Sequence, residues 1–396
     1  MKRINIFKSV IIAAAACAAA GCSDWMTPET EAFDEYSLTE VAKDDAYYAA
    51  LRAYKESDHA IAFGWYDGWG EPGLSTSRML SAVPDSMDII SLWDNSRGIS
   101  PEQKEDLRFV QDVKGTKVTV CFFASDVGNS FTPPEYTSGN EGVTLDDQKA
   151  FWGWEDGNDE AIRSSLAKYA AAIRDTIDFY GYDGIDIDYE PGGSLDQNMT
   201  YFTWFVQELG KYFGPKSGTD QLLIIDGYVN RLAAEIGPYC NYLVSQAYSV
   251  PGGTPPTNCG MTANQDYGTY MSGNASLQTR LNQVINTFSS TLSEEEVTNK
   301  FVVTDNLESA IDCLNGGYYW TDDQGRTWSK SVMPSLVGFA SWNPDNDFRK
   351  GGFGGYRFSN ERSNTPMFKW MRRAIQQQNP SSPEKALSPE DYVPVS

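Results

Sequence analysis

The 396-residue chain contains a single histidine, His59. A Ser-His-Asp triad would have to use this one side chain, and a zinc site built on two histidines is impossible. The six cysteines show no CxxC or other metal-ligand spacing. No glycine-rich dinucleotide or phosphate-binding fingerprint follows any expected strand. Any catalytic chemistry must therefore rest on carboxylates, tyrosines and amides.

Basic residues are scarce as well. Lys and Arg number 31 against 54 Asp and Glu, and the formal net charge is −23. A surface this acidic repels phosphate backbones, so nucleic acid is not an expected partner.

The N-terminus has the pattern of an export signal. Three basic residues precede an apolar run over residues 10–20, which is too short to span a membrane. The run ends Ala19-Ala20-Gly21-Cys22, as in bacterial lipoprotein signals. We expect residues 1–21 to be removed and Cys22 to carry the lipid, so that the protein is anchored to the membrane without spanning it. An ordinary secreted protein is the alternative. The loss of residues 1–21 removes three basic residues and no acidic one, which leaves a net charge of −26.

Three regions follow the expected signal. Residues 22–45 are predicted to form an acidic tether, because residues 23–40 hold six acids and no Lys or Arg. Such a tether favours an outer-membrane lipoprotein displayed at the cell surface. Residues 379–396 are rich in Pro and Ser and are predicted to form a flexible tail outside the fold. Residues 46–378 remain for one large catalytic domain, which we expect to be monomeric.

Short apolar runs alternate with helical patterns through this domain. Eight β-then-α units predict an α/β fold of the single (β/α)8 or TIM-barrel type. An open doubly wound sheet is the alternative, but it usually has fewer strands. The predicted strands are 59–65, 87–93, 117–123, 184–189, 222–227, 242–248, 301–304 and 336–342. The predicted helices are one that begins at Ser100-Pro101 and four at 160–180, 199–213, 276–288 and 366–378.

The fourth predicted strand carries the chemistry. It reads Asp183-Gly184-Ile185-Asp186-Ile187-Asp188-Tyr189-Glu190, and strand side chains alternate between two faces. Asp186, Asp188 and Glu190 therefore share the face that points into the barrel. Active sites of this fold lie where the strands end, so Glu190 is expected nearest the catalytic mouth. Burying three unpaired carboxylates costs several kcal/mol per ion, which argues against a purely structural role. Such crowding should raise at least one carboxyl pKa.

The pattern D-G-x-D-x-D-x-E on this strand resembles the signature of glycoside hydrolase family 18, the chitinases and endo-β-N-acetylglucosaminidases. The strand count extends the resemblance over most of residues 59–378. The resemblance implies that Glu190 protonates the glycosidic oxygen while the substrate's own 2-acetamido oxygen attacks C1. Asp188 would hold the acetamido N–H, with Asp186 hydrogen-bonded behind it, and the anomeric configuration would be retained. No metal or organic cofactor is implied.

Two further segments fit the same family. Gln246 and Tyr248 share one face of the sixth strand, where the family places a tyrosine that hydrogen-bonds the acetamido carbonyl. Chitinases typically show Met-x-Tyr, whereas Gln-x-Tyr is similar to endo-β-N-acetylglucosaminidases that act on N-glycans. Trp342, at the end of the predicted eighth strand, is similar to the tryptophan that forms the floor of the −1 sugar site. Other candidates for sugar contact, each with core packing as the alternative for the aromatics, are Trp65, Trp69, Trp93, Trp152, Trp154, Asp305 and Asn306.

The expected substrate follows from the sixth strand and from one short loop. Only about thirty residues separate Asp305 from Leu336, where many chitinases carry a sizeable insertion, so the cleft should be open. We expect hydrolysis of the β-1,4 bond between the two core N-acetylglucosamines of N-glycans. The alternatives are a chitinase-like hydrolase and a non-catalytic surface glycan-binding protein on the same barrel. Such binding proteins usually lack the terminal glutamate, which is present here as Glu190.

Overall fold

The computed structural model describes residues 43–70, 76–94, 96–195, 198–248 and 273–395. The predicted signal, Cys22 and most of the predicted tether lie outside these residues. Within the described part of the chain, no helix is both long and apolar enough to cross a lipid bilayer.

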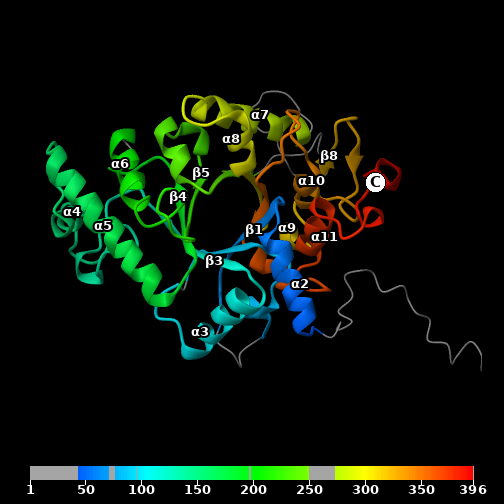
Figure 1. Ribbon diagram of the computed structural model, residues 1–396, viewed down its shortest axis with the longest axis horizontal. Coiled ribbons are helices and arrows are strands. Elements are labelled where there is room, and N and C mark those ends of the chain that lie inside the picture. The colour runs from blue at the N-terminus through cyan, green and yellow to red at the C-terminus, as the bar shows by residue number, and fades with distance from the viewer. Residues whose placement is uncertain (1–42, 71–75, 95, 196–197, 249–272, 396) are drawn as a thin grey trace, which may run out of the picture. The chain divides into compact units, whose positions relative to one another are not determined.

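Eight parallel strands close into a barrel with helices around it (Figure 1), which confirms the predicted TIM-barrel class. Seven strands lie where the sequence predicts them, with bounds shifted by a few residues at most. The barrel strands are β1 Ile61–Tyr66, β2 Ile89–Leu92, β3 Lys117–Phe123, β4 Gly184–Tyr189, β5 Leu222–Gly227, β6 Tyr242–Gln246, β7 Phe301–Asn306 and β10 Gly352–Tyr356.

The helices among the described residues include all five that the sequence predicts. Ser100 and Gln103 form the expected capping box at the start of α3, where the serine side chain accepts from the Gln103 N–H. The helices are α2 Asp45–Glu56, α3 Pro101–Arg108, α4 Leu145–Trp152, α5 Asp159–Tyr180, α6 Met199–Leu209, α7 Gly273–Phe288, α8 Glu294–Lys300, α9 Ala310–Asn315, α10 Ser335–Ser341 and α11 Lys369–Gln378.

The prediction for the eighth strand was wrong. Residues 335–341 form the helix α10, and the barrel closes through β10, which pairs with β1 and β7. The apolar run 336–340 is fully buried, and burial on all sides looks the same in a strand and in a short helix. The sequence of β10, Gly-Phe-Gly-Gly-Tyr, has too few side chains to give a strand pattern. Its glycines permit close contact, since a Cβ on Gly352 would lie 2.2 Å from the carbonyl oxygen of Ile61.

Strand alternation divides the core into two parts. One face of each strand packs under the surrounding helices, where α5, for example, contributes Leu166, Ile173 and Ile177. The other face fills the barrel with a smaller cluster that includes Trp65, Cys121 and, on β5, Ile224. The residues that point into the barrel therefore decide what its mouth offers to a ligand.

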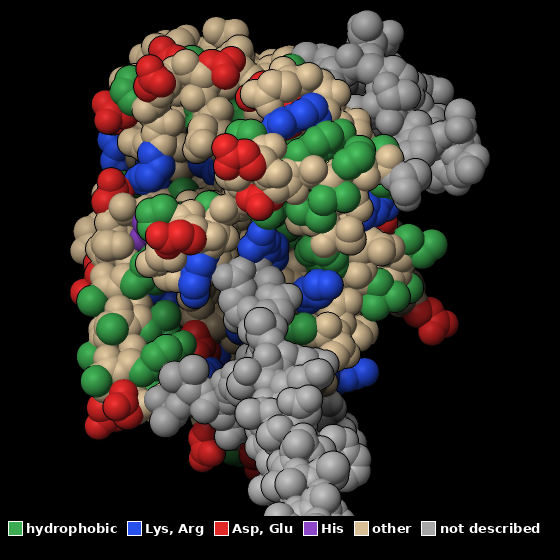
Figure 2. Space-filling model, turned by 90° about the vertical axis from the view of Figure 1, so that its right-hand side faces the viewer, with side chains coloured by type: hydrophobic (Ala, Val, Ile, Leu, Met, Phe, Trp, Pro, Cys, Tyr) green, Lys and Arg blue, Asp and Glu red, His purple; other side chains and the backbone are tan. Residues whose placement is uncertain are grey.

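The C-terminal segment does not form the predicted flexible tail. It packs beside a short antiparallel hairpin of β8 (Trp320–Thr321) and β9 (Thr327–Trp328). The Ser329 N–H donates to the Val393 carbonyl at 2.7 Å, and the Tyr392 hydroxyl donates to the Thr327 carbonyl at 3.2 Å. On the face shown in Figure 2, acidic and basic side chains are interspersed and no broad basic surface is visible.

Candidate active site

The acidic face of β4 points into the barrel, as the alternation predicts. Asp186 is fully buried and Asp188 is 3% exposed, whereas Glu190 lies just beyond the strand and is exposed. The intervening Ile185 and Ile187 pack in the outer part of the core. The three carboxyl groups thus form a column that runs from the barrel interior to its C-terminal mouth.

Asp186 is held by groups from the first two strands. The Trp65 indole N–H donates to Asp186 Oδ2 at 2.8 Å, and the Ser91 hydroxyl donates to the same oxygen at 2.7 Å. Trp65, predicted as a possible sugar contact, is 1% exposed inside the barrel. It therefore supports the carboxylate and is not placed to touch a sugar.

Gln246 connects β6 to the acidic column. Its amide nitrogen donates to Asp188 Oδ1 at 3.3 Å and to Asp226 Oδ1 at 2.6 Å. Asp226, near the end of β5, pairs in register with Asp188 and is fully buried. Asp226 is a site residue that was not predicted from the sequence, although Leu222, Ile224 and Asp226 alternate toward the barrel as the β4 acids do.

Crowding and burial change the protonation of this site in the expected direction. Burial, together with the negative charges of Glu190 and Asp186, raises the pKa of Asp188 to about 7. Burial also raises the pKa of Asp186, and it raises that of Asp226 well above the usual range. Since no carboxylate here is paired with Lys or Arg within the described residues, the column cannot ionise completely at neutral pH.

Three buried side chains in the barrel have the residue types of a metal site. Cys121, Asp186 and Asp226 each place one ligand atom within 4.8 Å of the others. In the protein alone, burial raises the pKa of the Cys121 thiol well above its usual value, as it raises those of the two carboxyls. We therefore interpret the group as one that shares protons.

Aromatic rings from four strand ends form a continuous wall beside the acidic column. The rings of Phe123 and Trp93 are 5.4 Å apart, those of Trp93 and Tyr356 5.8 Å, and those of Tyr356 and Tyr248 5.6 Å. Phe123 is 39% exposed. We call these four residues the aromatic wall. Trp93 and Tyr248 were predicted site residues, whereas Phe123 and Tyr356 were missed.

Trp342 does not lie at the end of a barrel strand. It caps the C-terminus of α10, is 1% exposed and packs against the ring of Phe301 at 6.3 Å. The buried Lys350 ammonium donates to its carbonyl oxygen. The expected position in a sugar site is therefore wrong, because it depended on the misassigned strand. Tyr356 is the aromatic residue that ends the eighth barrel strand.

Three of the remaining tryptophans belong to the outer core. Trp69, Trp152 and Trp154 are between 3% and 5% exposed. Their indole N–H groups donate to Asp106, Thr132 and Asp156 respectively. Core packing, the alternative left open for them, is what the structure shows.

Asp305 and Asn306, the last two residues of β7, face opposite sides of the strand. Asp305 faces outward, is 1% exposed and accepts from the Ser335 hydroxyl at the start of α10. Burial raises its pKa to about 7. It is therefore not placed to contact a sugar in the barrel mouth. Asn306 pairs in register with Tyr356 beside the aromatic wall, and its side-chain oxygen accepts from the Glu308 N–H at 2.8 Å.

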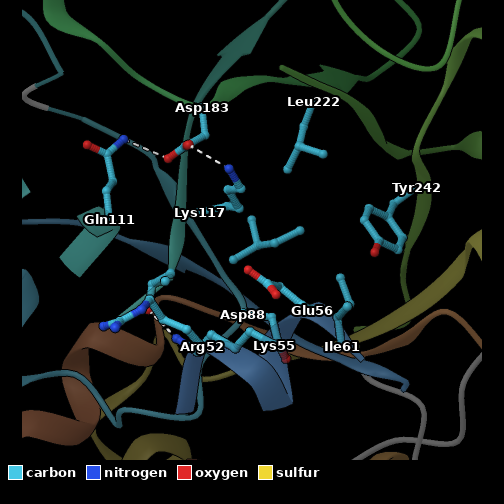
Figure 3. Close-up of a pocket in the computed structure, with 13 residues that line it drawn as sticks. Arg52, Lys55, Glu56, Ile61, Asp88, Gln111, Lys117, Asp183, Leu222 and Tyr242 are labelled. Carbon is cyan, nitrogen blue, oxygen red and sulfur yellow. Dashed lines mark hydrogen bonds and ion pairs between the residues drawn. The ribbon is translucent and has the colours of Figure 1, made fainter. Parts of the chain in front are cut away.

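A charged cavity of about 310 Å³ lies at the opposite end of the barrel, where the strands begin (Figure 3). Two of its carboxylates have partners, and Asp183 is bonded to Lys117 at 3.1 Å and to Gln111 at 2.6 Å. Asp88, in the same cavity, pairs with the only histidine, His59, at 3.0 Å. These pairs stabilise the closed end of the barrel and are separate from the acidic column at the mouth.

Comparison with known proteins identifies the architecture. The sequence model of the family described as glycoside hydrolase family 18, BT1044-like, matches residues 26–377. The chain is 28% identical over 211 residues to endo-β-N-acetylglucosaminidase F2 of Elizabethkingia meningoseptica. That match covers 50% of this chain and 53% of the other, so the chain spans about half the length of this curated relative.

Solved structures give the same picture. The structure of BT1044 in its selenomethionine E190Q form is 25% identical, has a TM-score of 0.67 and covers 85% of this chain and 94% of its own. An endo-β-N-acetylglucosaminidase from Cordyceps militaris in apo form is 21% identical, with a TM-score of 0.56 and coverage of 85% and 97%. At that identity the second likeness concerns the fold alone.

Proposed function

Because this chain belongs to glycoside hydrolase family 18, in its BT1044-like group, we propose that it hydrolyses N-glycans between the two core N-acetylglucosamines. The observation that carries the proposal is the acidic column. An exposed carboxyl, Glu190, stands at the barrel mouth above a buried one, Asp188, which is held by Gln246. The relative from Elizabethkingia meningoseptica is named for the same class of activity.

The column suits a reaction in which the substrate supplies its own nucleophile. Glu190, exposed at the mouth, protonates the glycosidic oxygen as the bond to C1 breaks. The 2-acetamido oxygen attacks C1, and Asp188 accepts the acetamido N–H and stabilises the positive charge that develops on the ring. Glu190, now a carboxylate, then removes a proton from water. Two displacements at C1 leave the configuration retained.

Asp186 and Tyr248 hold the reacting groups in place. Asp186 is bonded to Trp65 and Ser91 behind Asp188, so the acidic face of β4 cannot turn away from the substrate. Tyr248 is partly buried against Tyr356, and in the proposed reaction its hydroxyl holds the acetamido carbonyl. Such positioning of a nucleophile is worth a large share of a barrier.

The substrate preference can be measured by comparing two sets of glycans. We expect faster turnover of high-mannose or complex N-glycoproteins than of chitin oligomers of matched concentration, because the sixth strand carries Gln246 in place of the chitinase methionine. Mass spectrometry of the released glycans gives both rates. Faster turnover of chitin oligomers than of any glycoprotein would instead indicate a chitinase-like hydrolase. Retention of both substrates without turnover would indicate a binding protein.

A further inference from the structure

Asp226 is a fourth carboxyl group in the barrel, and the mechanism above does not use it. It lies on β5 directly beside the acidic strand, in register with Asp188, and is fully buried. Gln246 donates to its Oδ1 at 2.6 Å, and the Cys121 thiol donates to its Oδ2 at 3.8 Å. A carboxyl so placed must affect the charge of its neighbours.

The buried carboxyls of the barrel interior have no ion-pair partner among the described residues. None of the ion pairs among the described residues involves Asp186, Asp188 or Asp226. Three buried carboxylates without counter-charges would be strongly unfavourable. The repulsion between them is reduced most simply if one carboxyl stays protonated and donates a hydrogen bond to a neighbouring carboxylate.

The surroundings of the three carboxyls differ, and the difference indicates which of them holds the proton. Asp186 Oδ2 accepts from Trp65 and Ser91, but Asp186 Oδ1 is buried and has no hydrogen-bond partner among the described residues. A carboxyl oxygen of Asp226 lies within 4.8 Å of one of Asp186. A hydrogen bond between the two lowers the pKa of Asp186 and raises that of Asp226, as is expected if Asp226 is the donor. Asp188, by contrast, lies nearer the mouth and already accepts from Gln246.

We propose that Asp226 is a positioning residue that stays protonated through the reaction and donates a hydrogen bond to Asp186. The proton lets Asp186 remain an anion with all its acceptors satisfied, and Gln246 then aligns Asp188 against the neutral Asp226. Asp188 is thereby the carboxylate that meets the positive charge on the substrate. This role rests on the proposed function, whereas the location of the proton does not.

The titration of the neighbouring groups agrees with this placement. Burial and the charges of Asp188 and Asp186 raise the pKa of Asp226 well above its usual range. The groups that face Asp226 are Asp186 and Asp188 on β4, Cys121 on β3, and Gln246 and Tyr248 by β6. Burial also raises the pKa values of the Cys121 thiol and the Tyr248 phenol. Only carboxyls therefore exchange protons here near neutral pH.

Two substitutions separate this role from a merely structural one. Asp226→Asn keeps a neutral side chain whose amide can donate to Asp186, so kcat and KM should stay within about threefold of wild type. Asp226→Ala leaves a buried acceptor unsatisfied, so kcat should fall about 10- to 100-fold with little change in KM. Asp305→Asn is the matched control, because Asp305 is an equally buried carboxyl on a barrel strand that faces α10. Equal losses of kcat in the Asn and Ala variants would overturn the proposal.

The pH profile tests the charge of Asp226 directly. If the residue were ionised, Asp226→Asn would remove a negative charge beside Asp188 and lower its pKa, so the acidic limb of kcat/KM would move down by about one pH unit. We expect the limb to stay where it is in wild type. A downward shift of that size would contradict a protonated Asp226.

An infrared spectrum locates the proton without reference to catalysis. The free enzyme at about pH 9, where ordinary carboxyls are ionised, should show the carbonyl band of a protonated carboxylic acid. This band should be missing from Asp226→Asn and present in Asp305→Asn. Its persistence in Asp226→Asn would overturn the proposal. If the band behaves as expected but the wild type cleaves no glycan, the proposed function fails and the proton assignment stands.

Discussion

The Glu190→Gln variant should lose turnover by about 10² or more while it still binds the glycan. Gln is nearly the same size as Glu but has no proton of suitable acidity to give to the leaving oxygen. Glu190 is exposed at the end of the acidic column, so the substitution should leave the buried partners of Asp186 and Asp188 undisturbed. Initial rates and the glycan dissociation constant, measured on the same preparation, check both parts of the prediction.

The matched control for this prediction is Glu56→Gln. Glu56 is an exposed glutamate at the end of α2 and lines the cavity at the opposite end of the barrel. That variant should keep its turnover. Near-wild-type rates in Glu190→Gln would refute the assignment of the general acid.

The second large effect is expected for Asp188→Asn. A thiazoline that mimics the cyclic intermediate should inhibit the wild type tightly, as ligands that resemble a transition state do. The ionised Asp188 carboxylate faces the positive charge of that intermediate, so its replacement by a neutral amide should weaken inhibition and slow turnover, each by about 10². Inhibition constants for the two proteins measure the effect.

A different chemical outcome would contradict the role of Asp188. If a carboxylate of the enzyme were the nucleophile, a covalent glycosyl–enzyme adduct would accumulate with a slow substrate, and mass spectrometry would detect it on the intact chain. The substrate-assisted scheme predicts no such adduct. If an enzyme carboxylate were the nucleophile instead, Asp188→Asn would retain the wild-type affinity for the thiazoline.

The sequence predicted most of the barrel because its strands carry local signals. Seven strands appeared as short apolar runs, and seven apolar strands between helical patterns already point to a TIM barrel. The prediction of the eighth strand failed for a physical reason. The glycine-rich β10 has almost no side chains to alternate, while the buried run of α10 has the composition of an interior strand. The predicted position of Trp342 in the sugar site was wrong for the same reason, because it depended on that strand.

Site residues could be predicted only where the signal for them lies within a single strand. Asp186, Asp188 and Glu190 follow from alternation within eight residues, and Gln246 and Tyr248 from a resemblance at a second strand. Asp226 and Tyr356 belong to the site because of strands that meet only in the closed barrel.

Tryptophans gave a weaker signal than acids. An aromatic ring is favourable both in a core and against a sugar, so a tryptophan near a strand end carries little information about its direction. Trp152 and Trp154 pack in the outer core, whereas Trp93 joins the aromatic wall. A buried carboxylate without a counter-charge is unfavourable, so three acids on one buried strand indicate a functional role. The acidic strand therefore predicted the site better than the tryptophans did.

The most direct test of the account is the mass of a glycopeptide after treatment with the wild-type protein. Cleavage between the two core N-acetylglucosamines leaves one hexosamine on the asparagine, and we expect the peptide to carry that residue and no further core sugar. Glu190→Gln, treated in parallel, should leave the glycopeptide intact. A peptide that has lost every sugar and gained an aspartate, or one that is unchanged by the wild type, would contradict the central claim.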